Sequence, residues 1–122
     1  MIILNDKRFN NEIFFKAFSK EDIKNSPNNS TIIFEFDEND IDLYNFCKNS
    51  NIEYGVEISS ITEFIFITNL DAKYAFCNDI KFAKNLQKLA DNYLTQTKVI
   101  VKSSIKNIEK IALAEIDGIF VL

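Results

Sequence analysis

Short apolar segments recur along this chain at nearly constant intervals, and that rhythm limits the folds it can adopt. Segments typical of buried strands begin near residues 31, 53, 73, 98 and 118, so successive starts lie 22, 20, 25 and 20 residues apart. Strands that alternate with helices in this way form a parallel sheet with right-handed crossovers. The segments are almost entirely apolar, which is typical of a sheet covered on both faces.

The rhythm predicts a single α/β domain over residues 1–122, with a three-layer, doubly wound, mostly parallel five-stranded sheet of the flavodoxin-like type. The five strands belong to a core over residues 31–122. Residues 1–30 fit the pattern less well and are expected to form an N-terminal helical extension. Within it, Met1–Leu4 is a candidate added strand, and apolar residues at helical spacing predict a helix. Those residues are Phe9, Ile13, Phe14, Ala17 and Phe18.

The sequence marks two of the core helices with unequal clarity. Asp79–Gln96 is the clearest, because Leu86 and Leu89 share an apolar stripe opposite a row of polar side chains. Ser59–Leu70 is ambiguous, since its β-branched and aromatic residues also suit a strand. The tetrapeptide Ser60–Glu63 matches a capping box and favours a helix. Because its other face is also apolar, this helix is expected to be buried on more than one side.

The amino-acid composition argues against several classes of function. The chain has no His, one Arg and two Gly, and its net charge is −4. Nucleic-acid binders need a basic face, whereas the basic residues here are spread along the chain, so nucleic acid is not an expected partner. No apolar run approaches the ~20 residues of a membrane span. The N-terminus lacks the order of a signal peptide, so we expect no membrane contact and a cytoplasmic location. The abundance of Ile, Asn, Lys and Phe indicates a bacterial genome rich in AT.

Cysteines and glycines argue against metal and cofactor sites. Cys47 and Cys77 are expected to be reduced, buried residues, and two Cys without His cannot supply a usual zinc set. Phosphate-binding loops need Gly directly after a strand. Gly55 lies inside the second core strand and Gly118 at the start of the fifth, so no cofactor is expected.

Polar residues at the carboxyl ends of the strands are the one place where a site is expected, because ligands of open parallel sheets bind there. The candidates are Asp37, Glu57, Asp79, Lys102 and Ser103. The three acids are candidate Mg²⁺ ligands with Lys102 nearby, and Lys102 is also a candidate for Schiff-base chemistry. In the alternative interpretation such residues only cap helices, as every helix requires. The caps would then be Asp37, Ser60, Asn78 and Ser104.

The layout from Thr31 to Leu122 resembles the receiver domains of bacterial two-component signalling. Matching segments are TIIFEFD for their first strand, KYAFCND for the third, KVIVKSS for the fourth and AEIDGIFVL for the fifth. The resemblance implies that Asp37 stands at the acidic pair after the first strand and that Ser103 matches the hydroxyl residue after the fourth. Cys77 or Asn78 occupies the place of the phosphoacceptor aspartate. It therefore implies a degenerate receiver that cannot accept phosphate, with Asp79 as a displaced candidate.

A second resemblance is to aldolase-type (β/α)₈ barrels. It rests on the segments ITEFIFITNLDAKYAFC and KIALAEIDGIFVL, which look like strand–helix units of that family. A whole barrel needs ~250 residues, so this resemblance implies a half-barrel. The glycine-rich phosphate loops of the family are missing.

Together these observations predict a non-catalytic domain that works in protein–protein interaction or regulation. The missing His, Arg and Gly loops favour this over the alternative, a small lyase-like or hydrolase-like enzyme that uses the strand-end acids and Lys102. The expected partner is another protein or a second copy of the chain. A homodimer is expected through Gly118–Leu122, because an apolar edge strand without charge or Pro invites pairing.

Overall fold

The structure, a computed structural model, describes all residues from 1 to 122 as a seven-stranded parallel sheet with helices between the strands. The strands are β1 (Ile2–Leu4), β2 (Phe14–Lys16), β3 (Thr31–Glu35), β4 (Tyr54–Glu57), β5 (Tyr74–Cys77), β6 (Lys98–Ser103) and β7 (Gly118–Val121). The helices are α1 (Lys20–Lys24), α2 (Ile41–Asn49), α3 (Ile61–Asn69), α4 (Ile80–Tyr93) and α5 (Ile108–Leu113). Short 3₁₀ turns, η1 (Glu38–Asp40) and η2 (Ile105–Asn107), precede α2 and α5. The expected α/β class and parallel sheet are confirmed.

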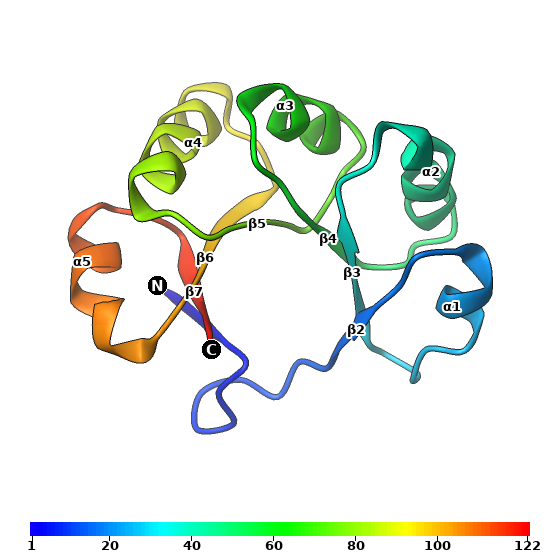
Figure 1. Ribbon diagram of the computed structural model, residues 1–122, viewed down its shortest axis with the longest axis horizontal. Helices are drawn as coiled ribbons and strands as arrows, with labels where there is room; N and C mark the ends of the chain where they lie inside the picture. Colours follow the sequence, from blue (N-terminus) through cyan, green and yellow to red (C-terminus); the bar gives the residue numbers. More distant parts are fainter.

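The strand order differs from the doubly wound expectation. The order is β1-β7-β6-β5-β4-β3-β2, so from β2 to β7 neighbours in the sheet are also neighbours in the chain. Right-handed crossovers that all move in one direction place every helix on the same face. Figure 1 shows all five helices outside a strongly curved sheet. The expected three layers and five strands are therefore corrected to one helix layer and seven strands.

The N-terminal residues complete the sheet at both of its ends. The strand expected at Met1–Leu4 is confirmed as β1, which pairs in parallel with β7, with Ile2 opposite Gly118. Because β7 has β1 on one side and β6 on the other, it is an inner strand. The free edge expected at Gly118–Leu122, and with it the basis for a dimer through that strand, is wrong.

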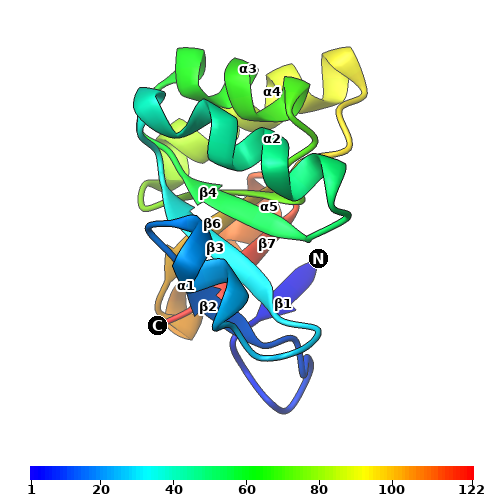
Figure 2. The same cartoon turned by 90° about the vertical axis from the view of Figure 1, so that its right-hand side faces the viewer.

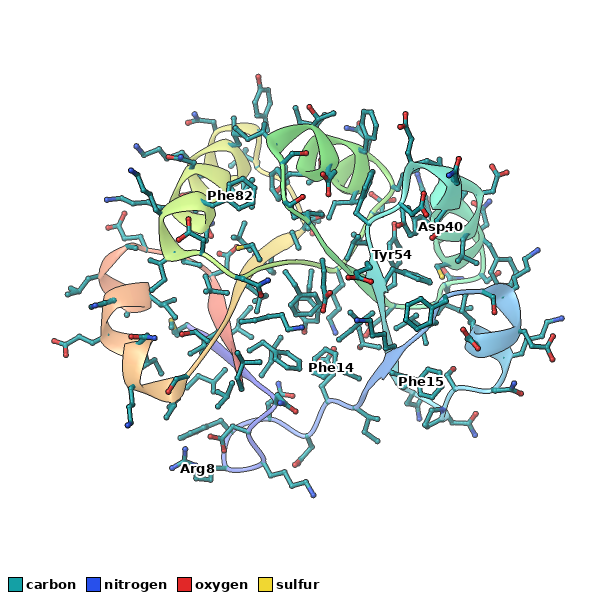
Figure 3. All side chains as sticks on the ribbon, viewed as in Figure 1. Arg8, Phe14, Phe15, Asp40, Tyr54 and Phe82 are labelled. Carbon is teal, nitrogen blue, oxygen red and sulfur yellow. The ribbon has the colours of Figure 1, made fainter.

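The helix expected between Phe9 and Phe18 is also wrong, because Phe14–Lys16 is strand β2, paired with β3. Phe15 packs on the side of the helices, and Phe14 packs on the side of the curved interior. Figure 3 shows the two rings on opposite sides of β2. Apolar residues at helical spacing here belong to a strand that has apolar surroundings on both faces, so spacing alone was misleading. The helix that follows, α1, has five residues.

Two apolar cores lie on the two faces of the sheet. The larger one fills the space between the sheet and the helices, and includes Phe34, Tyr44, Val56, Leu86 and Ile111. The smaller one lines the concave interior and consists of Leu4, Ile33, Tyr74, Phe76 and Ile100. Strand residues alternate between the two, which explains why the strands are apolar throughout although helices cover one face only.

Residues 5–13 cross the open side of the curved sheet between β1 and β2 (Figure 1). Seen from the side, this segment forms the loop opposite α2, α3 and α4 (Figure 2). Asn5 Nδ2 donates a hydrogen bond to the Val121 carbonyl at 2.7 Å, and the Ile13 carbonyl accepts from the Thr31 amide at 2.7 Å. The crossing segment is thus held at both of its ends.

Glu12 holds the crossing segment to the interior. Its carboxylate accepts hydrogen bonds from the Thr31 hydroxyl at 2.5 Å, the Tyr74 hydroxyl at 2.7 Å and Lys73 Nζ at 3.2 Å. Burial by itself would raise the pKa of Glu12, but these three bonds together hold it below its ordinary value of 4.5. For Tyr74, burial and the hydrogen bond to Glu12 raise the pKa to about 12.

Leu86→Ala tests the packing of α4 on the sheet. Leu86 is fully buried and Lys84 is exposed, so the predicted inward stripe is confirmed at Leu86. Truncation of a buried leucine costs ~2–5 kcal/mol of unfolding free energy. Lys84→Ala, on the opposite face of the helix, should cost less than about 0.5 kcal/mol. Equal losses in urea melts would contradict this packing.

Glu12→Gln tests the crossing segment. At neutral pH the variant should lose about 1–2 kcal/mol of unfolding free energy, because hydrogen bonds to a charged carboxylate are stronger than neutral ones. A carboxyl whose folded pKa is lowered stabilises the fold above its unfolded pKa and loses this contribution as the pH falls through the folded value. The difference from wild type should therefore shrink below pH 4.5.

Urea melts at several pH values measure this difference. The matched control is Glu53→Gln, since Glu53 also contacts Lys73 Nζ at 2.8 Å but its side chain is 62% exposed. The control should have little effect at any pH. A Glu12→Gln difference that stays constant with pH would mean that the charge of Glu12 does not stabilise the fold.

Candidate functional site

The carboxyl ends of the strands meet at one mouth of the curved sheet. The connections to the following helices are short: three residues separate β4 from α3, two separate β5 from α4, and one separates β6 from η2. Such short connections leave the inward-facing side chains at the strand ends close to the mouth. In singly wound parallel folds this is the end where functional side chains gather.

Lys102 and Glu57, two of the five predicted candidates, are in direct contact at this mouth. Lys102 Nζ lies 2.5 Å from Glu57 Oε1, and both side chains are 22% exposed. Lys16, which the sequence analysis did not single out, lies on the other side of the same carboxylate, with its Nζ 3.9 Å from Glu57 Oε2. The three residues come from β6, β4 and β2. A carboxylate is therefore held between two ammonium groups.

Aromatic side chains fill the interior beside these charges. Phe14 and Phe76 each meet Phe120 edge to face, with ring centroids 5.3 and 5.7 Å apart. Lys102 Nζ lies 5.5 Å from the centroid of the Phe120 ring, a cation–π distance. Gly55 makes room for these rings, because a Cβ there would lie 2.5 Å from Phe76 Cε2. The charged groups thus stand against a packed apolar interior.

The other three predicted candidates bond to their own neighbours along the chain. Asp37 Oδ1 accepts from the Asn39 amide at 2.9 Å and caps η1, and Asp79 Oδ2 accepts from the Phe82 amide at 2.9 Å and caps α4. Ser103 Oγ accepts from Asn107 Nδ2 at 2.9 Å. The capping interpretation is confirmed for Asp37, as it is for Ser60 and Ser104. It is wrong for Asn78, whose place as the cap of α4 belongs to Asp79.

The structure does not assemble the predicted Mg²⁺ ligands. Asp37 and Asp79 are helix caps, Glu57 contacts lysines, and no three His, Cys, Asp or Glu residues form a group that could hold a metal ion. Carboxylates from Asp37, Asp40, Glu57 and Glu63 do line a shallow groove of about 380 Å³ beside the mouth. Burial raises the pKa of Asp40, and the nearby charge of Asp37 adds to the rise. This groove repels further negative charge.

Both cysteines are free and buried. Burial raises the pKa of Cys47 to about 11 and that of Cys77 to about 12. A thiol is a nucleophile only as thiolate, and neither group is ionised at neutral pH.

The outward face of α3 is the surface that the sequence analysis missed. Ser60 Oγ accepts from the Glu63 amide at 3.1 Å, so the predicted cap and helix are confirmed. Burial on more than one side is wrong, because only Phe64 and Ile67 are buried. Ile61, Ile65 and Phe66 are 45%, 49% and 39% exposed. Since the helices form one outer layer, nothing in the chain covers this face.

The α3 face, which we define as Ile61, Thr62, Ile65, Phe66 and Asn69, carries no charge. The one charged residue of α3, Glu63, turns back to its own N-terminus, where Oε1 accepts from the Ser59 amide at 3.2 Å. An apolar groove of about 590 Å³ runs between α3 and the end of α4, lined partly by Ile65, Tyr93 and Leu94. The run ITEFIFITN, which carries apolar residues on more than one side of the helix, is the sequence signal for this surface.

No family model matches the chain, and no curated protein matches it. The longest helix, α4, has 14 residues, and none of the helices has the length and apolar character required to cross a membrane.

Proposed function

We propose that this protein acts through contacts with other protein molecules, in interaction or regulation, and that the α3 face is its contact surface. The exposed, uncharged face of α3 is the observation that carries the proposal. Contiguous apolar patches on a protein surface mark sites of interaction, and interface centres are depleted of charge and enriched in aromatic residues. Phe66 supplies exposed aromatic surface of this kind, and Tyr93 adds more at the groove beside Ile65.

The neighbouring helix shows that exposure in this layer does not require an apolar surface. On α4 the exposed residues include Lys81, Lys84, Asn85 and Lys88, as usual for a helix facing water. α3 lies beside α4 in the same layer (Figure 1). Its different composition therefore reflects something other than its place in the fold, and a protein partner accounts for it.

Photo-crosslinking in cells tests the contact surface. A benzophenone amino acid at position 66 should give a covalent adduct with another polypeptide, because Phe66 lies within the α3 face. The matched control is the same amino acid at position 113, since Leu113 is an exposed apolar residue on a different helix, α5. Adducts at both positions, or at neither, would contradict the proposal.

A second candidate function rests on the Lys102–Glu57 contact at the mouth. A neutral lysine amine attacks a carbonyl carbon, a C–N bond forms, and water leaves as the imine is made. In this candidate Lys102 is the nucleophile, and Glu57 accepts the ammonium proton and returns it to the departing hydroxyl. The protein would then be a small lyase-like enzyme acting on carbonyl compounds.

Borohydride trapping tests this candidate. Incubation with pyruvate or glyceraldehyde and sodium borohydride should attach the reduced compound to Lys102, as mass spectrometry of peptides would show. Lys102→Met should abolish the labelling and Lys16→Met should leave it in place, because only Lys102 lies within 3 Å of the carboxylate. Labelling spread evenly over surface lysines would exclude a specific role for Lys102.

A further inference from the structure

We infer that the partner at the α3 face is a second copy of this chain, packed about a two-fold axis that runs along α3. This inference rests on the proposed function, since it names the partner of the same surface. A two-fold interface sets one patch against itself. A charged patch repels its own copy, whereas the α3 face carries no charge and opposes its copy without repulsion.

The charges on either side of α3 fix the orientation of the two copies. α3 lies between α2 and α4 in the helix layer (Figure 1). At the start of η1 and α2, Glu38 and Asp42 are exposed; at the start of α4, Lys81 and Lys84 are exposed. None of these four residues forms an ion pair within the chain, where the salt bridges involve other residues.

A two-fold axis along α3 places α2 of one copy opposite α4 of the other. The helices run in the same direction, so their N-terminal ends stay at the same level. Acidic side chains of one copy then face basic side chains of its partner on both sides of the apolar centre. An axis across α3 would instead set α2 against α2 and α4 against α4 with the helices antiparallel. The acids at the start of α2 would then face Lys48, and the lysines at the start of α4 would face Asp91. Both of these residues already bond within their own chain, Lys48 to Asp71 and Asp91 to Gln87, so fewer free opposite charges would meet. Complementary rim charges favour the first arrangement.

The oligomeric state of the purified chain tests the inference. Light scattering across micromolar concentrations should give twice the 14.1 kDa of one chain. Ile65→Glu buries a charge at the centre of the interface and should weaken dimerisation by more than about 100-fold. Because Ile65 is half exposed, the variant should keep its circular dichroism spectrum. Leu113→Glu, on α5, is the matched control and should remain dimeric.

Charge reversal tests the orientation. Asp42→Lys and Lys81→Glu should each weaken the dimer by about 10-fold, because each opposes like charges across the rim. The double variant restores opposite charges between the copies and should recover most of the affinity. If the single variants have no effect, or the double variant is weaker than either, the axis does not run along α3.

The experiments distinguish the failure of the two proposals, the α3 face as a contact surface and a second copy of the chain as its partner. A purified chain that is monomeric at every concentration overturns the second copy as partner. If the crosslinker at position 66 then captures a different polypeptide in cells, the α3 face remains a contact surface for another protein. A monomer with no adduct at position 66 overturns both proposals.

Discussion

The sequential pairing of parallel strands determines the two surfaces of this protein. Each right-handed crossover returns the chain on the same face of the sheet, so the helices form a single outer layer and the sheet curves away from them. One face of every strand then lines the concave interior of the sheet, and the outer side of every helix is exposed to water. The aromatic interior with its Lys102–Glu57 contact and the exposed face of α3 both follow from this arrangement.

The sequence predicts the local elements well, because their signals are local. Strand segments from Thr31 onward and the caps at Asp37, Ser60 and Ser104 depend on residues a few positions apart. Strand order depends instead on the direction in which each crossover turns across the sheet. The pairing of Ile2 with Gly118 joins residues at opposite ends of the chain. No pattern of a few neighbouring residues predicts such a pairing.

The candidate site was predictable in part, through strand periodicity. Glu57 ends β4, Lys102 is the last residue but one of β6, and both face the interior, so they meet across β5. Ser103 follows Lys102 directly, and successive strand residues point to opposite faces, so Ser103 turns to Asn107 on the helix side. Lys16 is not among the candidates because the apolar spacing between Phe9 and Phe18 predicts a helix there, whereas Phe14–Lys16 forms strand β2. The α3 face was missed for a different reason: a helix that is apolar all round does not reveal which side its own chain leaves uncovered.

Leu94, at the end of α4, connects backbone geometry with the α3 face. It adopts the left-handed conformation, with φ 51° and ψ 45°, and ends the helix where Gly or Asn is the usual residue. For a leucine this conformation costs about 1–2 kcal/mol. Asn51 and Asp71, one residue after the C-caps of α2 and α3, adopt the left-handed conformation too, with polar side chains that tolerate it. The apolar side chain of Leu94 does not stabilise the left-handed conformation in this way. It is also 84% exposed, in the groove beside Ile65. In the free chain the leucine therefore combines backbone strain with apolar exposure, and a partner on the α3 face would relieve the second of these costs.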